Sequence, residues 1–263
     1  MFILPVSIIL GSSISLINIV LFSLCYVFIY FSNNNFKIYD FKPVLILAIL
    51  NIYLVFNSLI SIDIISGSYR NLGFLRFILF FLMVNYFFFI NEKNLNILKV
   101  WTIIFFIVLI DIYIERFTGS NIFGFGKLEI NGVPQPHGDR VVSFFRNEPI
   151  AGSFICGFGF IILGYILNFL KFKKSLKIIG FLIILLCLIG IMITGERSNG
   201  LKALIGLLIF ISIIDYVKLR SKIMILFSLF IIFFLTINFS EYAKFRYVDT
   251  FYNKLKTKDD REK

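Results

Sequence analysis

The chain has 263 residues, of which 59% are hydrophobic and 16% are charged, and its formal net charge is +11. Soluble domains contain roughly 45–50% apolar residues, so a water-soluble fold of this length could not bury so much apolar side chain. The basic residues are spread over short loops, which membrane topology explains better than nucleic-acid binding does. All cysteines lie in apolar segments and there is one histidine, so neither a disulfide nor a metal site is expected.

Apolar segments in chain order are long enough to cross a ~30 Å hydrocarbon core, which takes about 20 residues. They lie at residues 3–31, 43–62, 71–90, 98–115, 149–170, 176–194, 200–217 and 222–239. The first would span ~43 Å as one helix at 1.5 Å per residue. Because Gly11, Ser12 and Ser13 interrupt it, we expect the end of one helix, a break, and a second helix from about Leu16. The sequence predicts an all-α polytopic transmembrane helix bundle of eight or nine spans, whose first helix begins before this chain does.

Lysine-rich loops set the expected orientation in the membrane. The loops at 171–177 and 218–222 are the most basic, and the positive-inside rule places them in the cytoplasm. Alternation places the 63–70 loop, the long 116–148 segment and the 195–199 turn outside. We therefore expect a transmembrane domain over 1–239 with an outer loop at 116–148, followed by a polar C-terminal tail over 240–263.

Ionisable residues within membrane spans are costly and usually face a bundle interior or a cavity. Here they share the outer third of the spans. Asp111 and Glu115 are spaced i, i+4, so they lie on one helical face, and we expect Arg76 within salt-bridge reach of one of them. One interpretation of these three residues is an ion pair with a purely structural role. The other is that they support a functional site by positioning its residues.

Arginines beside an outer cavity suit a phosphate or diphosphate ligand, because guanidinium is permanently charged and binds phosphate oxygens in bidentate fashion. Arg197 lies in the polar turn between Gly195 and Gly200, and Lys202 follows it. A nearby acidic residue would act as general base on a sugar hydroxyl. The same layout suits a transporter of an anionic lipid, or basic side chains that only reach the lipid headgroups.

Three segments in chain order carry a resemblance to a known family. Asp111 through Glu115 is followed by Gly119–Gly124, Gly138–Phe145 leads into Asn147–Phe154, and Thr194–Leu201 forms a Gly-Glu-Arg-Ser turn that enters a helix. These elements resemble those of the O-antigen ligase and O-antigen polymerase family. They cover about residues 110 to 201, and the number of apolar segments extends the likeness along the chain.

The resemblance implies a polytopic, multi-pass glycosyltransferase of the bacterial inner (plasma) membrane with its active face in the periplasm. Such an enzyme transfers a glycan from undecaprenyl diphosphate to a lipid A core or to a growing glycan, in lipopolysaccharide or other surface polysaccharide biosynthesis. It needs no metal and no cofactor, because the lipid diphosphate is the leaving group. Membrane lipids surround it, and nucleic acid is no partner.

The resemblance also implies roles for residues. Arg140 and Arg197 match the family's outward arginines and would bind the diphosphate. Glu148 and His137 are the catalytic candidates for acid–base chemistry that the outer segment itself offers. His137 does not match the position of the family's catalytic histidine, and a solvated loop histidine would look the same. The supporting residues are Arg76, Asp111, Glu115 and Arg146.

The chain departs from this family in two ways. Members usually have more spans and a large outer loop near the C-terminus that bears a catalytic histidine, whereas here no histidine follows His137. We therefore expect a truncated member, and an inactive fragment is one alternative. A transporter or flippase of a lipid-linked sugar is the other; it should show repeated halves with Gly- or Pro-broken helices, which the sequence lacks.

Overall fold

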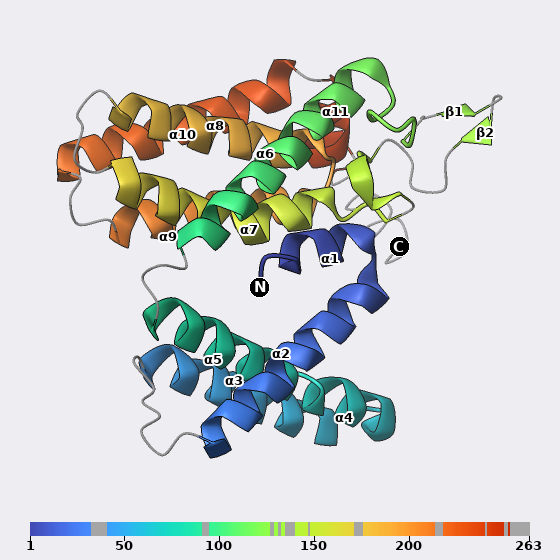
Figure 1. The fold of residues 1–263 in the computed structure, drawn as a ribbon. Helices are drawn as coiled ribbons and strands as arrows, with labels where there is room; N and C mark the ends of the chain where they lie inside the picture. Colours follow the sequence, from blue (N-terminus) through green and yellow to red (C-terminus); the bar gives the residue numbers. More distant parts are fainter. Residues whose placement is uncertain are drawn as a thin grey trace. The chain divides into compact units, whose positions relative to one another are not determined.

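The computed structural model describes residues 1–32, 41–90, 95–126, 129–130, 133–134, 140–146, 148–170, 176–213, 218–239, 241–249 and 252. It divides into two compact units, Met1–Lys99 and Val100–Lys263. The described regular structure is helical apart from β1 (Glu129–Ile130) and β2 (Val133–Pro134), which form a short antiparallel pair (Figure 1). The predicted all-α class is confirmed.

The first unit, coloured blue to teal in Figure 1, is a group of helices. They are α1 (Leu4–Leu10), α2 (Ser12–Ser32), α3 (Phe41–Leu59), α4 (Ile64–Leu72) and α5 (Leu75–Ile90). Helix α2 packs against α5, and α3 packs against α4. The predicted break in the first segment occurs at Gly11, whose φ of 134° is accessible mainly to glycine, and the second helix begins at Ser12 rather than near Leu16.

The prediction of a loop at 63–70 is wrong, because most of that stretch forms α4. Asp63 caps this helix: its carboxylate accepts the backbone N–H of Ser66 at 3.1 Å and the Ser66 hydroxyl at 2.7 Å. The side-chain hydrogen bond from Ser66, followed by the backbone one, lowers the pKa of Asp63 below its ordinary value. The chain then turns at Gly73 and α5 begins at Leu75, so the predicted 71–90 segment belongs to two helices.

The second unit runs from green to red in Figure 1. Its helices are α6 (Leu95–Thr118, beginning in the first unit), η2 (Ser143–Phe145), α7 (Ala151–Leu170), α8 (Leu176–Ile193), α9 (Arg197–Ile213), α10 (Leu219–Phe239), α11 (Glu241–Lys244) and the π-helical η3 (Phe245–Asp249). Each of α7, α8 and α9 packs against the other two, and α10 lies against α8 and α9.

Aromatic side chains and glycines bring α6 onto α7 and α8. The rings of Trp101 and Phe158 meet edge to face at 5.5 Å, and Trp101 is almost fully buried. The Tyr113 hydroxyl donates to the carbonyl oxygen of Leu186 at 2.8 Å. A Cβ on Gly190 would lie 2.6 Å from Cδ1 of Leu109, so a larger residue here would require the Leu109 side chain to shift.

In the part of the chain that the structure describes, five helices are long and apolar enough to cross a membrane. They are Ser12–Ser32, Lys42–Leu59, Ile64–Phe88, Asn96–Thr118 and Leu219–Phe239, where Ile64–Phe88 is one candidate span that combines α4 with most of α5. Two shorter apolar helices lie at Ala151–Leu167 and Gly180–Ile193. Large apolar side chains such as Phe28 (74% exposed) and Phe31 (78% exposed) would be unfavourable in water. These helices indicate a membrane-embedded protein, and the count of eight or nine spans stays a prediction.

The start of the predicted polar tail is helical, since α11 and η3 occupy 241–249. Helix α11 contacts α8 as well as α10, and Ala243 is fully buried. This stretch therefore packs onto the second unit. Residues 250–251 and 253–263 lie outside the described residues.

Candidate functional site

The predicted site residues of the second unit belong to segments that meet where α6 ends and where α7 and α9 begin. Helix α6 carries Asp111 and Glu115 in its last two turns, on one face as their spacing predicts. Both side chains are buried, with exposed fractions of 0% and 4%. Their partners come from the segments that follow α6.

Every oxygen of these two carboxylates accepts a hydrogen bond. Glu115 accepts the backbone N–H of Val142 at 2.9 Å on Oε1 and that of Ser143 at 2.5 Å on Oε2. Asp111 accepts the backbone N–H of Ile122 at 3.0 Å on Oδ1 and the Ser143 hydroxyl at 2.5 Å on Oδ2. Charge-assisted bonds of this kind are strong. The pair on α6 therefore fixes the two ends of the outer loop.

Asn121 and Ser143 complete this cluster, and the sequence analysis did not identify either. Asn121 is buried; its Oδ1 accepts the N–H groups of Phe123 and Phe125 at 3.0 and 2.7 Å, and its Nδ2 donates to the carbonyl oxygen of Ser143 at 2.9 Å. Ser143 is fully buried with a φ of 51°, which is unfavourable for a residue with a Cβ. The hydrogen bonds to Ser143 hold that conformation.

Gly126 lies directly against Glu115. Its φ is 82°, and a Cβ at this position would lie 2.0 Å from Oε1 of Glu115. Glycine is therefore needed here both for the backbone conformation and for space. The run of glycines at 119, 124 and 126 was the signal in the sequence, but it did not reveal which of them touches a carboxylate.

A third carboxylate, that of Glu196, occupies the turn between α8 and α9. Its Oε1 accepts the backbone N–H of Gly152 at 2.7 Å, in the first turn of α7, and its Oε2 accepts the Ser153 hydroxyl at 3.2 Å. Asn199 donates through Nδ2 to Oε2 of Glu196 and to the Ser153 hydroxyl oxygen, the latter at 2.8 Å. Burial raises the pKa of Glu196 above its ordinary value, and these hydrogen bonds oppose the shift.

The two clusters are joined through the backbone. The N–H of Val141 donates to the carbonyl oxygen of Thr194 at 3.2 Å. Val141 directly follows Arg140, and Thr194 lies in the turn that leads into Arg197, the first residue of α9. Arg140 is exposed and Arg197 is half-buried. The fold thus brings the segments of both predicted phosphate-binding arginines together.

The remaining predicted residues have different positions. Glu148 and Arg146 are exposed in the segment that leads into α7, and the φ of Arg146 is 57°. His137 lies outside the described residues.

Arg76 belongs to the first unit, where it is the second residue of α5. Its guanidinium carbon lies 5.0 Å from the centre of the Phe77 ring, and its buried Nε has no hydrogen-bond partner. Asp111 and Glu115 belong to the second unit, so their pairing with Arg76 stays a prediction.

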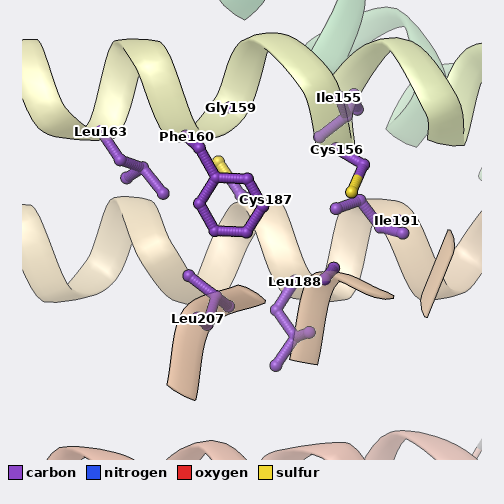
Figure 2. A pocket seen from close by; sticks show the side chains of 10 residues that line it. Ile155, Cys156, Gly159, Phe160, Leu163, Cys187, Leu188, Ile191 and Leu207 are labelled. Atoms are coloured by element: carbon purple, nitrogen blue, oxygen red, sulfur yellow. The ribbon is translucent and has the colours of Figure 1, made fainter. Parts of the chain in front are cut away.

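A small apolar recess lies between α7, α8 and α9. Figure 2 shows Cys156, Phe160 and Leu163 of α7 reaching toward α8. The recess measures about 220 Å³, counting the part that is open to the outside. Cys156 is one helical turn beyond Gly152, so the recess begins one turn from the Glu196 cluster.

Fold and site together define a helical, membrane-embedded protein with a buried pair of carboxylates, a half-buried glutamate and two arginines at one end of its second unit. No protein-family model, curated protein or solved structure matches the chain. The function is therefore inferred from the side chains at this end and from the resemblance of the three segments.

Proposed function

We propose that the protein is a membrane glycosyltransferase that ligates or polymerises an oligosaccharide carried on undecaprenyl diphosphate. The acceptor is a lipid A core or a growing glycan, and the reaction takes place at the periplasmic face of the bacterial inner membrane. The observation that carries the proposal is the hydrogen bond from Val141 to Thr194, because it joins the segments of Arg140 and Arg197.

The two arginines suit the leaving group of this reaction. In glycan transfer the bond between the sugar C1 and the diphosphate oxygen breaks, a bond forms from C1 to the acceptor oxygen, and the diphosphate leaves with the charge. Guanidinium groups aimed at the phosphate oxygens stabilise that charge as it develops. The buried carboxylates of Asp111 and Glu115 hold the loop that carries Arg140, since they bind the neighbouring residues Val142 and Ser143.

A base must accept the proton of the acceptor hydroxyl. Glu148 is exposed just before α7, at the end of the second unit where Gly152 meets Glu196, and it is the candidate that the described residues offer. His137 is the second candidate. Each oxygen of Asp111 and Glu115 already accepts a hydrogen bond inside a buried cluster, so in this proposal they support the loop and Glu148 takes the proton.

The proposed topology has eight or nine spans, with α7, α8 and α9 crossing the membrane in addition to the five long helices. The basic loops around 171–177 and 218–222 then face the cytoplasm, and the turn before Arg197 faces the periplasm.

The test measures transfer of a glycan from undecaprenyl diphosphate by the full-length protein in proteoliposomes. Arg197→Ala removes a charged donor worth about 1.5–3 kcal/mol, so transfer at low substrate concentration falls roughly 10- to 100-fold. Arg197→Lys is also impaired, because lysine cannot make the planar bidentate contact. The matched control is Arg220→Ala, an exposed arginine at the start of α10, which leaves transfer unchanged. Full transfer by Arg197→Ala at normal membrane abundance would refute the diphosphate-binding role.

A further inference from the structure

Glu196 joins the first turns of two helices that are far apart in sequence. Its backbone carbonyl accepts the N–H groups of Asn199 and Gly200 at 3.0 and 3.1 Å, so it begins α9. Its carboxylate meanwhile accepts the N–H of Gly152 and the hydroxyl of Ser153 in the first turn of α7. The partially positive N-terminal ends of both helices therefore meet one acidic side chain.

We propose that Glu196 is the positioning residue of this site: by tying the first turn of α9 to the first turn of α7, it fixes the direction of the Arg197 side chain and thereby sets the affinity for the lipid diphosphate. The inference rests on the proposed function in one respect, namely that Arg197 binds the diphosphate. Glu196 itself contacts helix termini and takes no part in the chemical step.

The geometry separates a positioning role from that of a general base. Oε1 of Glu196 accepts the N–H of Gly152, and Oε2 accepts from both Ser153 and Asn199. All three donors belong to the first turns of α7 and α9, so both oxygens are engaged in joining the two helices. A base would instead need a free oxygen within hydrogen-bond reach of the substrate.

The surroundings of Glu196 are shaped to keep it in place. A Cβ on Gly152 would lie 2.7 Å from Oγ1 of Thr194 and 3.1 Å from the Glu196 carboxyl carbon, so a larger residue would push the turn away from α7. On the far side of the first turn of α9, a Cβ on Gly200 would lie 2.2 Å from the Tyr247 hydroxyl oxygen. The first turn of α9 is thus held between α7 and the η3 segment, with Arg197 at its beginning.

The variants differ in how much of the link they remove. Glu196→Ala removes both oxygens, Glu196→Gln keeps one acceptor oxygen in a side chain of the same shape, and Ser153→Ala removes only one donor. Ser212→Ala is the control, because this serine lies near the other end of α9 and its hydroxyl donates to the carbonyl oxygen of Leu208 in the same helix.

Two measurements are made on the full-length protein in detergent. The first is backbone hydrogen exchange, which reports the link directly: exchange at Gly152 and in the first turn of α9 becomes faster in Glu196→Ala. The second is binding of farnesyl diphosphate, together with KM and kcat for glycan transfer. A displacement of about 1 Å can cost roughly 100-fold in such a site, so Glu196→Ala raises Kd and KM by roughly 10- to 100-fold while kcat changes much less. The Kd and KM values of Glu196→Gln and Ser153→Ala lie between those of Glu196→Ala and those of the wild type.

The outcomes distinguish the positioning role of Glu196 from the proposed glycosyltransferase function. Unchanged hydrogen exchange in Glu196→Ala would overturn the link. Faster exchange with unchanged Kd and KM would overturn the positioning role and leave the proposed function standing. A wild-type protein that neither binds the diphosphate nor transfers glycan would overturn the proposed function and the positioning role together, and this result appears before any substitution is made.

Discussion

The hydroxyl of Ser143 donates a hydrogen bond to Oδ2 of Asp111 at 2.5 Å, between residues 32 positions apart in the sequence. Both residues have no exposed surface, and Ser143 holds a left-handed backbone conformation. One serine thus connects the last turns of α6 to the end of the outer loop, two residues beyond the hydrogen bond between Val141 and Thr194. The stability of this connection can be measured by substitution.

Ser143→Ala leaves one oxygen of a buried carboxylate without its donor while keeping the strained backbone. We expect it to lower the free energy of unfolding by about 1–3 kcal/mol. Ser143→Gly loses the same hydrogen bond but relieves a backbone cost of about 1–2 kcal/mol, so it should be the less damaging variant. Denaturant unfolding in detergent measures both. If Ser143→Gly is the more destabilised of the two, the account of backbone strain is wrong.

Gly126 and Gly124 form a matched pair for a substitution to alanine. Their φ values are 82° and 79°, so alanine costs about 1–2 kcal/mol of backbone strain at either position. Only at position 126 does the new Cβ meet Oε1 of Glu115, whereas open space surrounds position 124. Gly126→Ala should therefore be clearly less stable and should free the loop for proteolysis, as limited trypsin digestion would show. Equal effects at both positions would contradict the contact with Glu115.

The pairing of Arg76 with Asp111 or Glu115 can be tested by a double-mutant cycle. Removing one partner of a buried ion pair costs about 3–5 kcal/mol, and removing both costs less than the sum of the single losses. The variants are Arg76→Met with Asp111→Asn, and Arg76→Met with Glu115→Gln. If the losses of stability are additive in both cycles, Arg76 pairs with neither carboxylate. The contact of Arg76 with the ring of Phe77 on α5 then remains its observed interaction.

The stability of the protein should depend on pH through Glu196. Burial raises the pKa of this carboxyl above its ordinary value of 4.5, so between that pH and the folded-state pKa the folded protein holds a proton that the unfolded chain has released. The free energy of unfolding therefore falls as the pH rises through this window.

Glu196→Gln removes this contribution, because its amide does not titrate. Thermal unfolding midpoints of the wild type and the variant are measured from mildly acidic to neutral pH. The midpoint of the wild type should fall more steeply with rising pH than that of the variant, so the stability advantage of the wild type should shrink toward neutral pH. A wild-type midpoint that rises through the window would show that the pKa is lowered instead.

The topology is testable with single cysteines in a background without Cys25, Cys156 and Cys187. Ser198→Cys, in the exposed first turn of α9, should react with an impermeant thiol reagent added outside intact cells. Ser221→Cys, beside the basic residues at the start of α10, should react only after the membrane is opened. The reverse pattern would invert the proposed orientation and place the Arg197 turn in the cytoplasm.

Local features of the sequence determined where the helices lie. Hydrophobic length indicated the long helices, and Gly11 marked the break between α1 and α2. The stretch at 63–70 lies between two apolar segments and therefore predicts a loop, although an aspartate such as Asp63 is also a favoured helix N-cap. Helix formation depends on backbone bonds between near neighbours, so these features are readable from one short segment at a time.

Only the tertiary structure decided what the polar side chains at the end of the second unit contact. The i, i+4 spacing of Asp111 and Glu115 placed them on one face, but their donors come from Ile122, Val142 and Ser143, which no spacing rule connects to α6. Glu196 was regarded as part of the polar surroundings of Arg197, while its partner Gly152 lies 44 residues earlier. A buried polar group must find a hydrogen-bond partner, and which distant segment supplies it depends on how the apolar helices pack.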